Sequence, residues 1–140
     1  MKKKYILILL LFGIFIFFGC SKISDDIIGS WDFQTFSANN EGRVTWTFRQ
    51  DGRLIRTFIN NNNDGELLLV SDTSSYSVSK SMTKKLVIIT GSKDIPGSLS
   101  PEGTLRISKF KDGILIMTRT QLSGTKREDA YLRCELIRKN

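Results

Sequence analysis

Histidine is absent from this sequence of 140 residues, and cysteine and proline each occur only twice. Without histidine, the chain lacks the most frequent general base of enzymes and the most frequent ligand of transition metals. Its two cysteines, Cys20 and Cys134, are too few for a framework of disulfide bonds. The composition therefore argues against a disulfide-rich domain and against histidine-based chemistry, and the length predicts a single domain.

A strongly basic character is also lacking once the first residues are set aside. The formal net charge is +7, but Lys2, Lys3 and Lys4 account for three of the 21 basic residues, which leaves 18 against 14 acidic ones. Such a small excess does not indicate a nucleic-acid-binding domain.

Only one long apolar run is present, and it is short for a membrane span. It reads "YILILLLFGIFIFF" and follows the basic start "MKKK". A spanning helix needs about 20 apolar residues, so this run is typical of the central region of a signal peptide. A plain secretory signal would close on small residues in an Ala-x-Ala pattern. This run closes instead on Phe17-Phe18-Gly19-Cys20.

These four residues resemble the lipobox of bacterial lipoproteins, in which a bulky apolar residue, any residue and a small residue precede a cysteine. Phe17 stands where leucine is usual. The resemblance implies that residues 1–19 are a cleaved signal peptide, that the Cys20 thiol carries a diacylglycerol and that its new amino group is acylated. Two or more acyl chains hold a protein firmly in a bilayer. The alternative is an uncleaved signal anchor with a chance cysteine.

Residues 20–28 then form the lipidated tether. Ser21 is not the aspartate that retains many lipoproteins at the inner membrane, so the resemblance implies the outer membrane, on its periplasmic or cell-surface face. Asp25 and Asp26 resemble loosely the acidic signals that send some lipoproteins to the cell surface. A solvated linker is the favoured interpretation of these two residues.

From residue 29 onward, apolar and polar residues alternate between clusters of Gly, Asn and Asp, which indicates strands and turns. The inward face of the third strand stays open between Leu54 with Phe58 and Ile55 with Ile59. Eight sequential strands with one buried face predict an all-β, eight-stranded up-and-down antiparallel barrel over 29–140. The expected strands are 30–36, 43–49, 53–59, 66–80, 85–90, 104–110, 114–121 and 130–138.

The stretch "IIGSWDF" resembles the Gly-x-Trp signature of lipocalins through Gly29 and Trp31. The stretches "VTWTFRQDGRL" and "YLRCELIRK" are similar to the second hairpin and the last strand of small lipocalin-like domains in bacterial lipoproteins. The resemblance implies that Trp31 plugs one end of the barrel and that a late arginine packs across it. Arg138, in phase with Leu136, is the residue expected there. Because the chain is shorter than a full lipocalin, a smaller interior is implied.

Four residues, Trp46, Phe48, Tyr76 and Met117, are the candidates for binding a ligand inside the barrel. An eight-stranded barrel is only just wide enough to be filled by side chains or to hold one small ligand. These residues therefore either line a pocket for a small apolar ligand or fill the centre, and filling is favoured. Cys134 faces inward by phase and is expected to be a small buried residue.

Catalytic and metal motifs are matched only superficially. "SVSK" and "SMTK" fit Ser-x-x-Lys, and "YSVSK" fits Tyr-x-x-x-Lys, but each motif needs a helix and partner motifs that the sequence lacks. "NNNNDG" resembles the start of a calcium loop, yet Ser71 stands where a bidentate glutamate is required. We therefore expect a protein that is not an enzyme and has no metal or cofactor.

The expected function is binding by a lipid-anchored monomer. The partner is a small apolar ligand or an envelope protein. The alternative is a protein-interaction or inhibitor module with a solid barrel, in which loops 60–65, 91–103 and 122–129 carry the contacts. Outward basic residues either face anionic lipid headgroups or polysaccharide, or are ordinary solvated positions. These residues are Arg43, Arg49, Arg53, Arg56, Arg106 and Arg119.

Overall fold

The structure is a computed structural model that describes residues 22–34, 42–61, 67–80, 83–121 and 132–139. The expected signal peptide, Cys20 and most of loops 60–65 and 122–129 lie outside these residues. The elements are α2 (Lys22–Ile27), β1 (Gly29–Phe33), β2 (Gly42–Phe48), β3 (Arg53–Asn61), β4 (Leu67–Lys80), β5 (Lys85–Thr90), β6 (Gly103–Lys111), β7 (Ile114–Gln121) and β8 (Arg133–Arg138).

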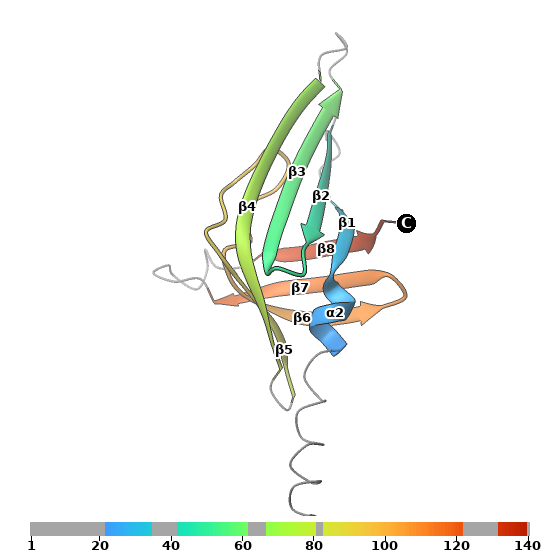
Figure 1. Cartoon of the computed structure of the whole chain (residues 1–140), viewed down its shortest axis with the longest axis vertical. Coiled ribbons are helices and arrows are strands. Elements are labelled where there is room, and N and C mark those ends of the chain that lie inside the picture. Colours follow the sequence, from blue (N-terminus) through green and yellow to red (C-terminus); the bar gives the residue numbers. More distant parts are fainter. Residues whose placement is uncertain (1–21, 35–41, 62–66, 81–82, 122–131, 140) are drawn as a thin grey trace, which may run out of the picture.

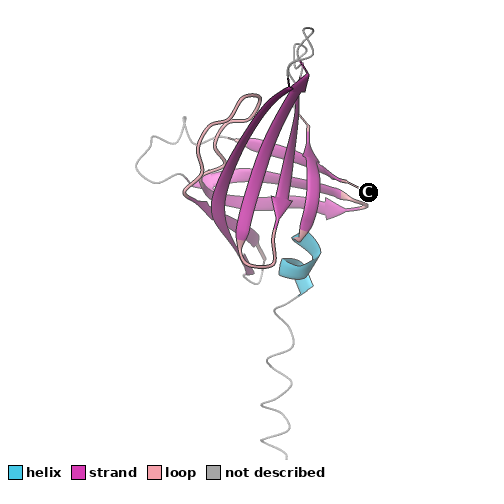
Figure 2. Cartoon of the chain, turned by 45° about the horizontal axis from the view of Figure 1, so that its top comes forward, coloured by secondary structure: helices cyan, strands magenta, loops and turns pink. Residues whose placement is uncertain are grey.

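The eight strands form one closed antiparallel barrel (Figures 1 and 2). Each strand pairs with the next along the chain, and β1 pairs with β8, where Trp31 lies opposite Arg138. The predicted fold class is confirmed, and the arrangement is consistent with a lipocalin-like barrel. Closure leaves every strand paired on both sides along part of its length, so the barrel has no open sheet edge.

Two tight hairpins follow from local sequence. Gly52 has a φ of 79° and lies in the turn between β2 and β3, as the Asp-Gly pair predicts. Between β6 and β7, Asp112 and Gly113 have φ values of 55° and 72°. A two-residue turn with positive φ at both central residues has a twist that matches the twist of antiparallel strands.

The inward face of β3 is the one that carries Leu54 and Phe58, which are both buried. Since side chains alternate along a strand, Arg56 between them also points inward, and its side chain is 0% exposed. Arg119 is likewise in phase with the buried Leu115 and is only half-exposed. The outward orientation expected for these two arginines is therefore wrong.

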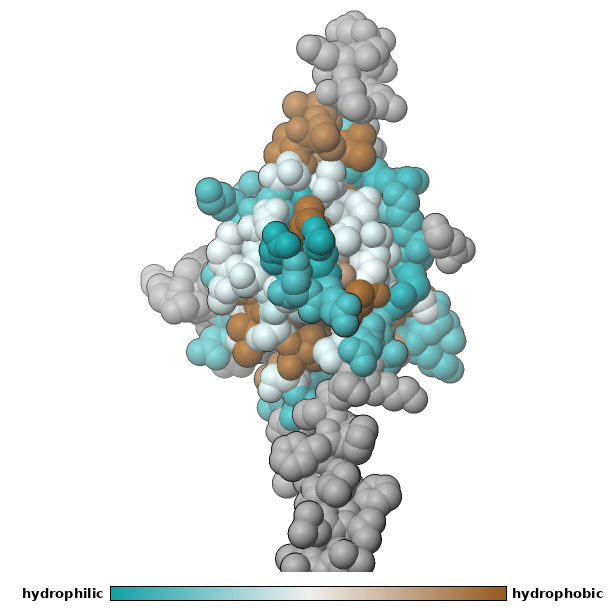
Figure 3. All heavy atoms as spheres, in the orientation of Figure 1, coloured by the Kyte–Doolittle hydropathy of each residue, from teal (hydrophilic) through white to brown (hydrophobic). Residues whose placement is uncertain are grey.

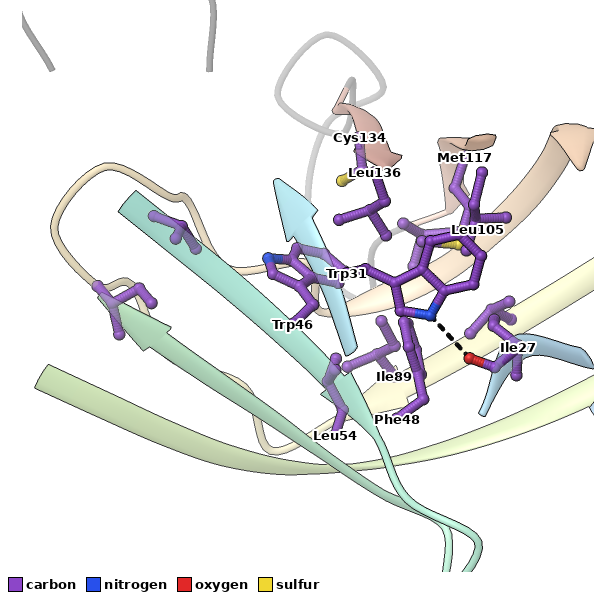
Figure 4. Close-up of a cluster of buried hydrophobic side chains, with 14 of the residues drawn as sticks. Ile27, Trp31, Trp46, Phe48, Leu54, Ile89, Leu105, Met117, Cys134 and Leu136 are labelled. Carbon is purple, nitrogen blue, oxygen red and sulfur yellow. Dashed lines mark hydrogen bonds between the residues drawn. The ribbon is translucent and has the colours of Figure 1, made fainter. Parts of the chain in front are cut away.

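The centre of the barrel is filled by buried apolar side chains from seven strands and by the partly buried Val70, Tyr76 and Val78 of β4 (Figure 4). They include both tryptophans and the sulfur-bearing Met117 and Cys134. The buried cluster consists of Ile27, Trp31, Val44, Trp46, Phe48, Leu54, Phe58, Val87, Ile89, Ile95, Leu105, Leu115, Met117, Cys134 and Leu136.

The segment expected as a tether, residues 20–28, contains the helix α2 in its described part. The α2 helix ends in Ile27, whose side chain is 1% exposed and belongs to the buried cluster. The helix covers one end of the barrel (Figure 2). In a solvated linker the Ile27 side chain would be exposed to water. Here it is buried, and its removal from water stabilises the folded chain. Within the described residues, no helix is long and apolar enough to cross a membrane.

Because the strands alternate in direction, their connections fall into two groups. The anchor end, as we call it, consists of α2, the connections 49–52 and 112–113, the starts of β1, β3, β5 and β7 and the ends of β2, β4, β6 and β8. The far end consists of the opposite ends of these strands and of the connection 91–102. In Figure 1 the helix lies low, whereas the end of β3 and the start of β4 lie at the top.

Candidate functional site

Trp31 and Arg138 close the anchor end of the barrel. The Trp31 side chain is fully buried, and the Arg138 guanidinium carbon lies 4.5 Å from the centroid of its ring. Trp31 Nε1 donates a hydrogen bond to the Ile27 carbonyl at 2.9 Å (Figure 4), and Arg138 donates to the Asp26 carbonyl. The two residues that the lipocalin resemblance pairs are thus in contact, and both also hold the helix.

Gly29 explains why glycine precedes this tryptophan by two residues. Its φ is +127°, a conformation that L side chains rarely adopt. A Cβ atom there would lie 3.4 Å from Arg138 Nη1. The Gly-x-Trp pattern therefore has a local cause, since the chain must leave α2 and enter β1 directly beside the arginine that covers Trp31.

Three of the four candidate ligand residues, Trp46, Phe48 and Tyr76, form a row of neighbouring rings, and Met117 belongs to the same buried cluster. Trp46, Phe48 and Met117 are buried. The Phe33 ring stacks on Trp46 with centroids 5.5 Å apart, and the Phe48 ring meets Tyr76 edge-on at 5.0 Å. Such pairs contribute beyond the area that they bury. A hollow of about 560 Å³ at the anchor end and one of about 250 Å³ beside β5 and β6 are lined by none of the four.

Tyr76 lies at the margin of this row and is half-buried. Its hydroxyl donates a hydrogen bond to the Arg49 carbonyl at 2.8 Å. Burial, and secondarily the Asp51 carboxylate, raises the pKa of Tyr76 above its ordinary value. The tyrosine is therefore a neutral residue that ties the β2–β3 turn to β4.

Arg56 is the centre of a buried polar network at the far end. Its Nη2 donates to Asp72 Oδ2 at 2.8 Å, and the Asp72 side chain is only 8% exposed. Arg56 and Asp72 are direct partners in the β3–β4 pairing. Burial acts to raise the pKa of Asp72, but hydrogen bonds from Arg56, Ser92 and the Lys93 backbone outweigh it and hold the pKa below its ordinary value.

The same arginine fastens the β5–β6 connection, residues 91–102, over the far end. Arg56 donates to the Leu99 carbonyl at 3.0 Å and to the Lys93 carbonyl. Arg119 adds hydrogen bonds to the Ser100 and Glu102 carbonyls at 3.1 and 3.3 Å. The connection is thus folded onto the barrel by the two arginines that point inward.

Apolar contacts complete this cover. Ile95 is buried, and a Cβ atom on Gly97 would lie 3.3 Å from a Val44 methyl group and 3.5 Å from the Phe58 ring. Gly97 has a φ of +71°, within a turn in which Ile95 and Ser98 exchange backbone hydrogen bonds. The far end of the barrel is therefore closed by residues 91–102, as the anchor end is closed by α2.

Two buried N–H groups have no hydrogen-bond partner within the described residues, Trp46 Nε1 and Arg56 Nε. The Arg56 guanidinium carbon lies 5.8 Å from the centroid of the Trp46 ring. Unpaired buried donors cost free energy. A small molecule that carries a hydrogen-bond acceptor could accept a hydrogen bond from either group inside the barrel.

Within the described ranges, the buried thiol and the acidic side chains are not grouped as a metal site. Burial raises the pKa of the Cys134 thiol to about 12, so it stays protonated at neutral pH and is a poor nucleophile. Among the described residues, no three His, Cys, Asp or Glu side chains are placed to hold a metal ion.

Exposed apolar side chains gather at the far end, on the β3–β4 hairpin. Leu69 is 60% exposed, Leu68 is 44% exposed and Ile59 is 39% exposed. Ile59 and Leu69 lie opposite each other on the outer face of the strand pair, whereas Leu68, in phase with the half-buried Val70, lies on its inner face at the same end. Figure 3 shows the resulting apolar patch at the top of the described molecule, over the ends of β3 and β4. We call these three residues the hairpin patch.

Cations predominate at the anchor end. Its described basic side chains outnumber the acidic ones by nine to four. The basic residues are Arg49, Arg53, Lys80, Lys84, Lys85, Lys109, Lys111, Arg138 and Lys139, and the acidic residues are Asp25, Asp26, Asp51 and Asp112.

Sequence reasoning missed the Arg56–Asp72 pair and the packing of α2. A signal for the pair was available, because Arg56 is in phase with Leu54 and Phe58 in the register that proved correct. No comparable signal marked α2, since a helix of six residues with one buried side chain shows no periodicity.

No family model matches the chain, and neither a curated protein nor a solved structure was found to match it.

Proposed function

We propose that this chain is a lipoprotein of the cell envelope, anchored in the outer membrane through acylated Cys20, that acts by binding and not by catalysis. The lipobox-like end of the apolar run supports the anchor. The protonated, buried Cys134 and the lack of a metal-binding cluster among the described residues give no support to an enzyme.

The observation that carries the choice of partner is the closed, filled barrel. Residues 91–102 cover one end, α2 covers the other, and Trp46, Phe48 and Met117 belong to the packed centre between them. An interior of this kind favours a protein partner over a small apolar ligand. The barrel then serves as a rigid support for contacts made on its surface.

The hairpin patch is the best candidate for those contacts. Leu68 and Leu69 are large apolar residues that remain in water, and desolvating them on a partner would stabilise a complex. The patch lies at the far end, opposite α2. A chain held in the membrane through Cys20 would therefore present the patch away from the bilayer, toward another envelope protein.

Site-specific photo-crosslinking in cells tests this proposal. A photo-reactive residue in place of Leu69 should crosslink to a protein partner, and Ile59→Lys, on the same face and directly opposite Leu69, should reduce that product at least about tenfold. A photo-reactive residue in place of Ile137, which is 45% exposed at the anchor end, is the matched control. Equal products from both positions would overturn the patch as the binding surface.

The other candidate, a small ligand inside the barrel, has one observation in its favour, namely the unpaired Trp46 Nε1 and Arg56 Nε. Native mass spectrometry of the purified chain distinguishes the two functions. A stoichiometric small molecule that is lost in Trp46→Phe would support internal ligand binding and contradict the packed interior.

A further inference from the structure

A second hollow lies on the outer surface of β5 and β6 and has a volume of about 250 Å³. Three cations line it, Lys85, Arg106 and Lys109, and no carboxylate does. All three side chains are exposed. None of them forms an ion pair with a carboxylate in the part of the chain that the structure describes.

A β-bulge in β6 creates this grouping. Ile107 lies opposite Met117 and Lys109 lies opposite Ile116, so Ser108 is an extra residue on β6. In a regular strand Lys109 would share the inward face of Ile107. The bulge turns Lys109 outward beside Arg106, as bulges next to binding sites re-aim side chains.

The hollow also has hydroxyl groups suited to an anion. Thr83 and Ser108 line it together with the three cations. Hydroxyl, guanidinium and ammonium groups are all donors to phosphate oxygens. Three like charges around one concavity repel one another, and a bound anion would remove that repulsion.

The position of the hollow indicates where the anion comes from. It shares Lys85 and Phe110 with the larger hollow of about 560 Å³ at the anchor end, which Asp25 and Asp26 of α2 also line. Cys20 precedes the first residue of α2 by two positions, a reach of at most about 7 Å. Acyl chains on Cys20 would therefore bring this end of the barrel to the bilayer surface.

We propose that the hollow formed by Lys85, Arg106 and Lys109 binds the phosphate group of an anionic lipid headgroup, in the membrane that holds the acyl chains of Cys20. The inference rests on the proposed lipid anchor. It adds that the barrel is oriented on the membrane, with the anchor end against the headgroups. Lysine and arginine near an anionic bilayer each strengthen such a contact.

Lysine footprinting of the intact chain in vesicles tests this site. An amine-acylating reagent and peptide mass spectrometry compare vesicles of phosphatidylcholine with vesicles that also contain phosphatidylglycerol. The anionic vesicles should slow the labelling of Lys85 and Lys109 about fivefold. Lys93, exposed in the far-end connection, is the internal control and should be labelled equally in both. Equal labelling of Lys85 in both vesicles would overturn the proposal.

A charge variant and a soluble anion complete the test. Arg106→Gln should remove most of the protection of Lys85 and Lys109, whereas Arg43→Gln, an exposed arginine in β2, should keep it. Protection by inorganic phosphate, equal to that by phosphatidylglycerol, would identify free phosphate as the ligand and contradict the lipid. The mass of the Cys20 peptide reports the anchor separately. If that peptide is not acylated, the soluble lipid dihexanoyl-phosphatidylglycerol still tests the hollow, and a lack of protection by it would overturn the site.

Discussion

At the scale of single residues, the barrel buries an arginine, Arg56, beneath the connection that covers its far end. The buried Arg56 guanidinium has lost its contacts with water. In their place it donates hydrogen bonds to Asp72 and to carbonyl groups of the 91–102 connection. A buried ion pair is weak evidence of net stabilisation, but removing one partner leaves the other charge uncompensated. The pair therefore acts mainly to fix the one arrangement in which residues 91–102 cover the barrel.

Replacing this arginine should be costly. Arg56→Met should lower the free energy of unfolding by about 3 kcal/mol, because Asp72 is then buried without its partner. Arg53→Met is the matched control on the same strand, since the ion pair of Arg53 with Asp51 is exposed to solvent and its loss should leave the free energy of unfolding nearly unchanged. Urea unfolding measures both values, and equal losses would contradict a central role for Arg56.

Asp72 should make stability depend on acid. Its pKa in the folded chain lies below the ordinary value of 3.8, so its stabilisation is complete above about pH 4 and is lost as the pH falls through the folded pKa. Asp72→Asn should therefore lose less stability than the natural chain between pH 5 and pH 2. Urea midpoints across this range give the comparison, and parallel curves would argue against the pair.

At the scale of elements, the eight strands could be predicted because each buries one face and exposes the other. The β5 and β7 strands match the predicted 85–90 and 114–121 residue for residue. β4 is one continuous strand within the predicted range 66–80. Its inward Ser74 is buried, and its hydroxyl donates a hydrogen bond to the Leu54 carbonyl.

The site was less predictable than the fold, for a physical reason. Arg56 and Asp72 are 16 residues apart and meet only through the β3–β4 register, which alternation alone left open. The pairing of Trp31 with Arg138 came from the family resemblance, because nothing local links residues from the first and the last strand. The contact of Trp31 with α2 depends on Ile27, whose burial no periodic pattern indicated.

Ile27→Ala tests whether α2 belongs to the folded unit. We expect it to lower the free energy of unfolding by about 2–4 kcal/mol, as for other buried isoleucines. The control is Ile137→Ala, at a side chain that is 45% exposed, and its cost should stay below about 1 kcal/mol. A small loss at both positions would restore residues 22–28 to the role of a tether.

At the scale of the whole molecule, the two ends of the barrel differ in chemistry. The anchor end carries the cation excess and the hollow of Lys85, Arg106 and Lys109, and α2 joins it to the segment that contains Cys20. The far end carries the hairpin patch and the folded connection 91–102. A lipid-anchored chain would thus place its charged end against the membrane and its apolar patch toward a partner.

Acylation of Cys20 should decide where the chain is found. Cys20→Ser should leave the chain without a lipid and unable to be processed as a lipoprotein, whereas Cys134→Ser should not change its acylation, because Cys134 is buried in the barrel. Detergent extraction of a membrane fraction, followed by immunoblotting for the two variants, gives the comparison. An unchanged migration and extraction of Cys20→Ser would contradict the anchor.

The most direct measurement of the central claim is the mass of the N-terminal peptide of the chain isolated from its own membranes. The account predicts a peptide that begins at Cys20 and carries a diacylglycerol on the thiol and an acyl group on the amino terminus. A peptide that begins at Met1, or an unmodified Cys20, would contradict it.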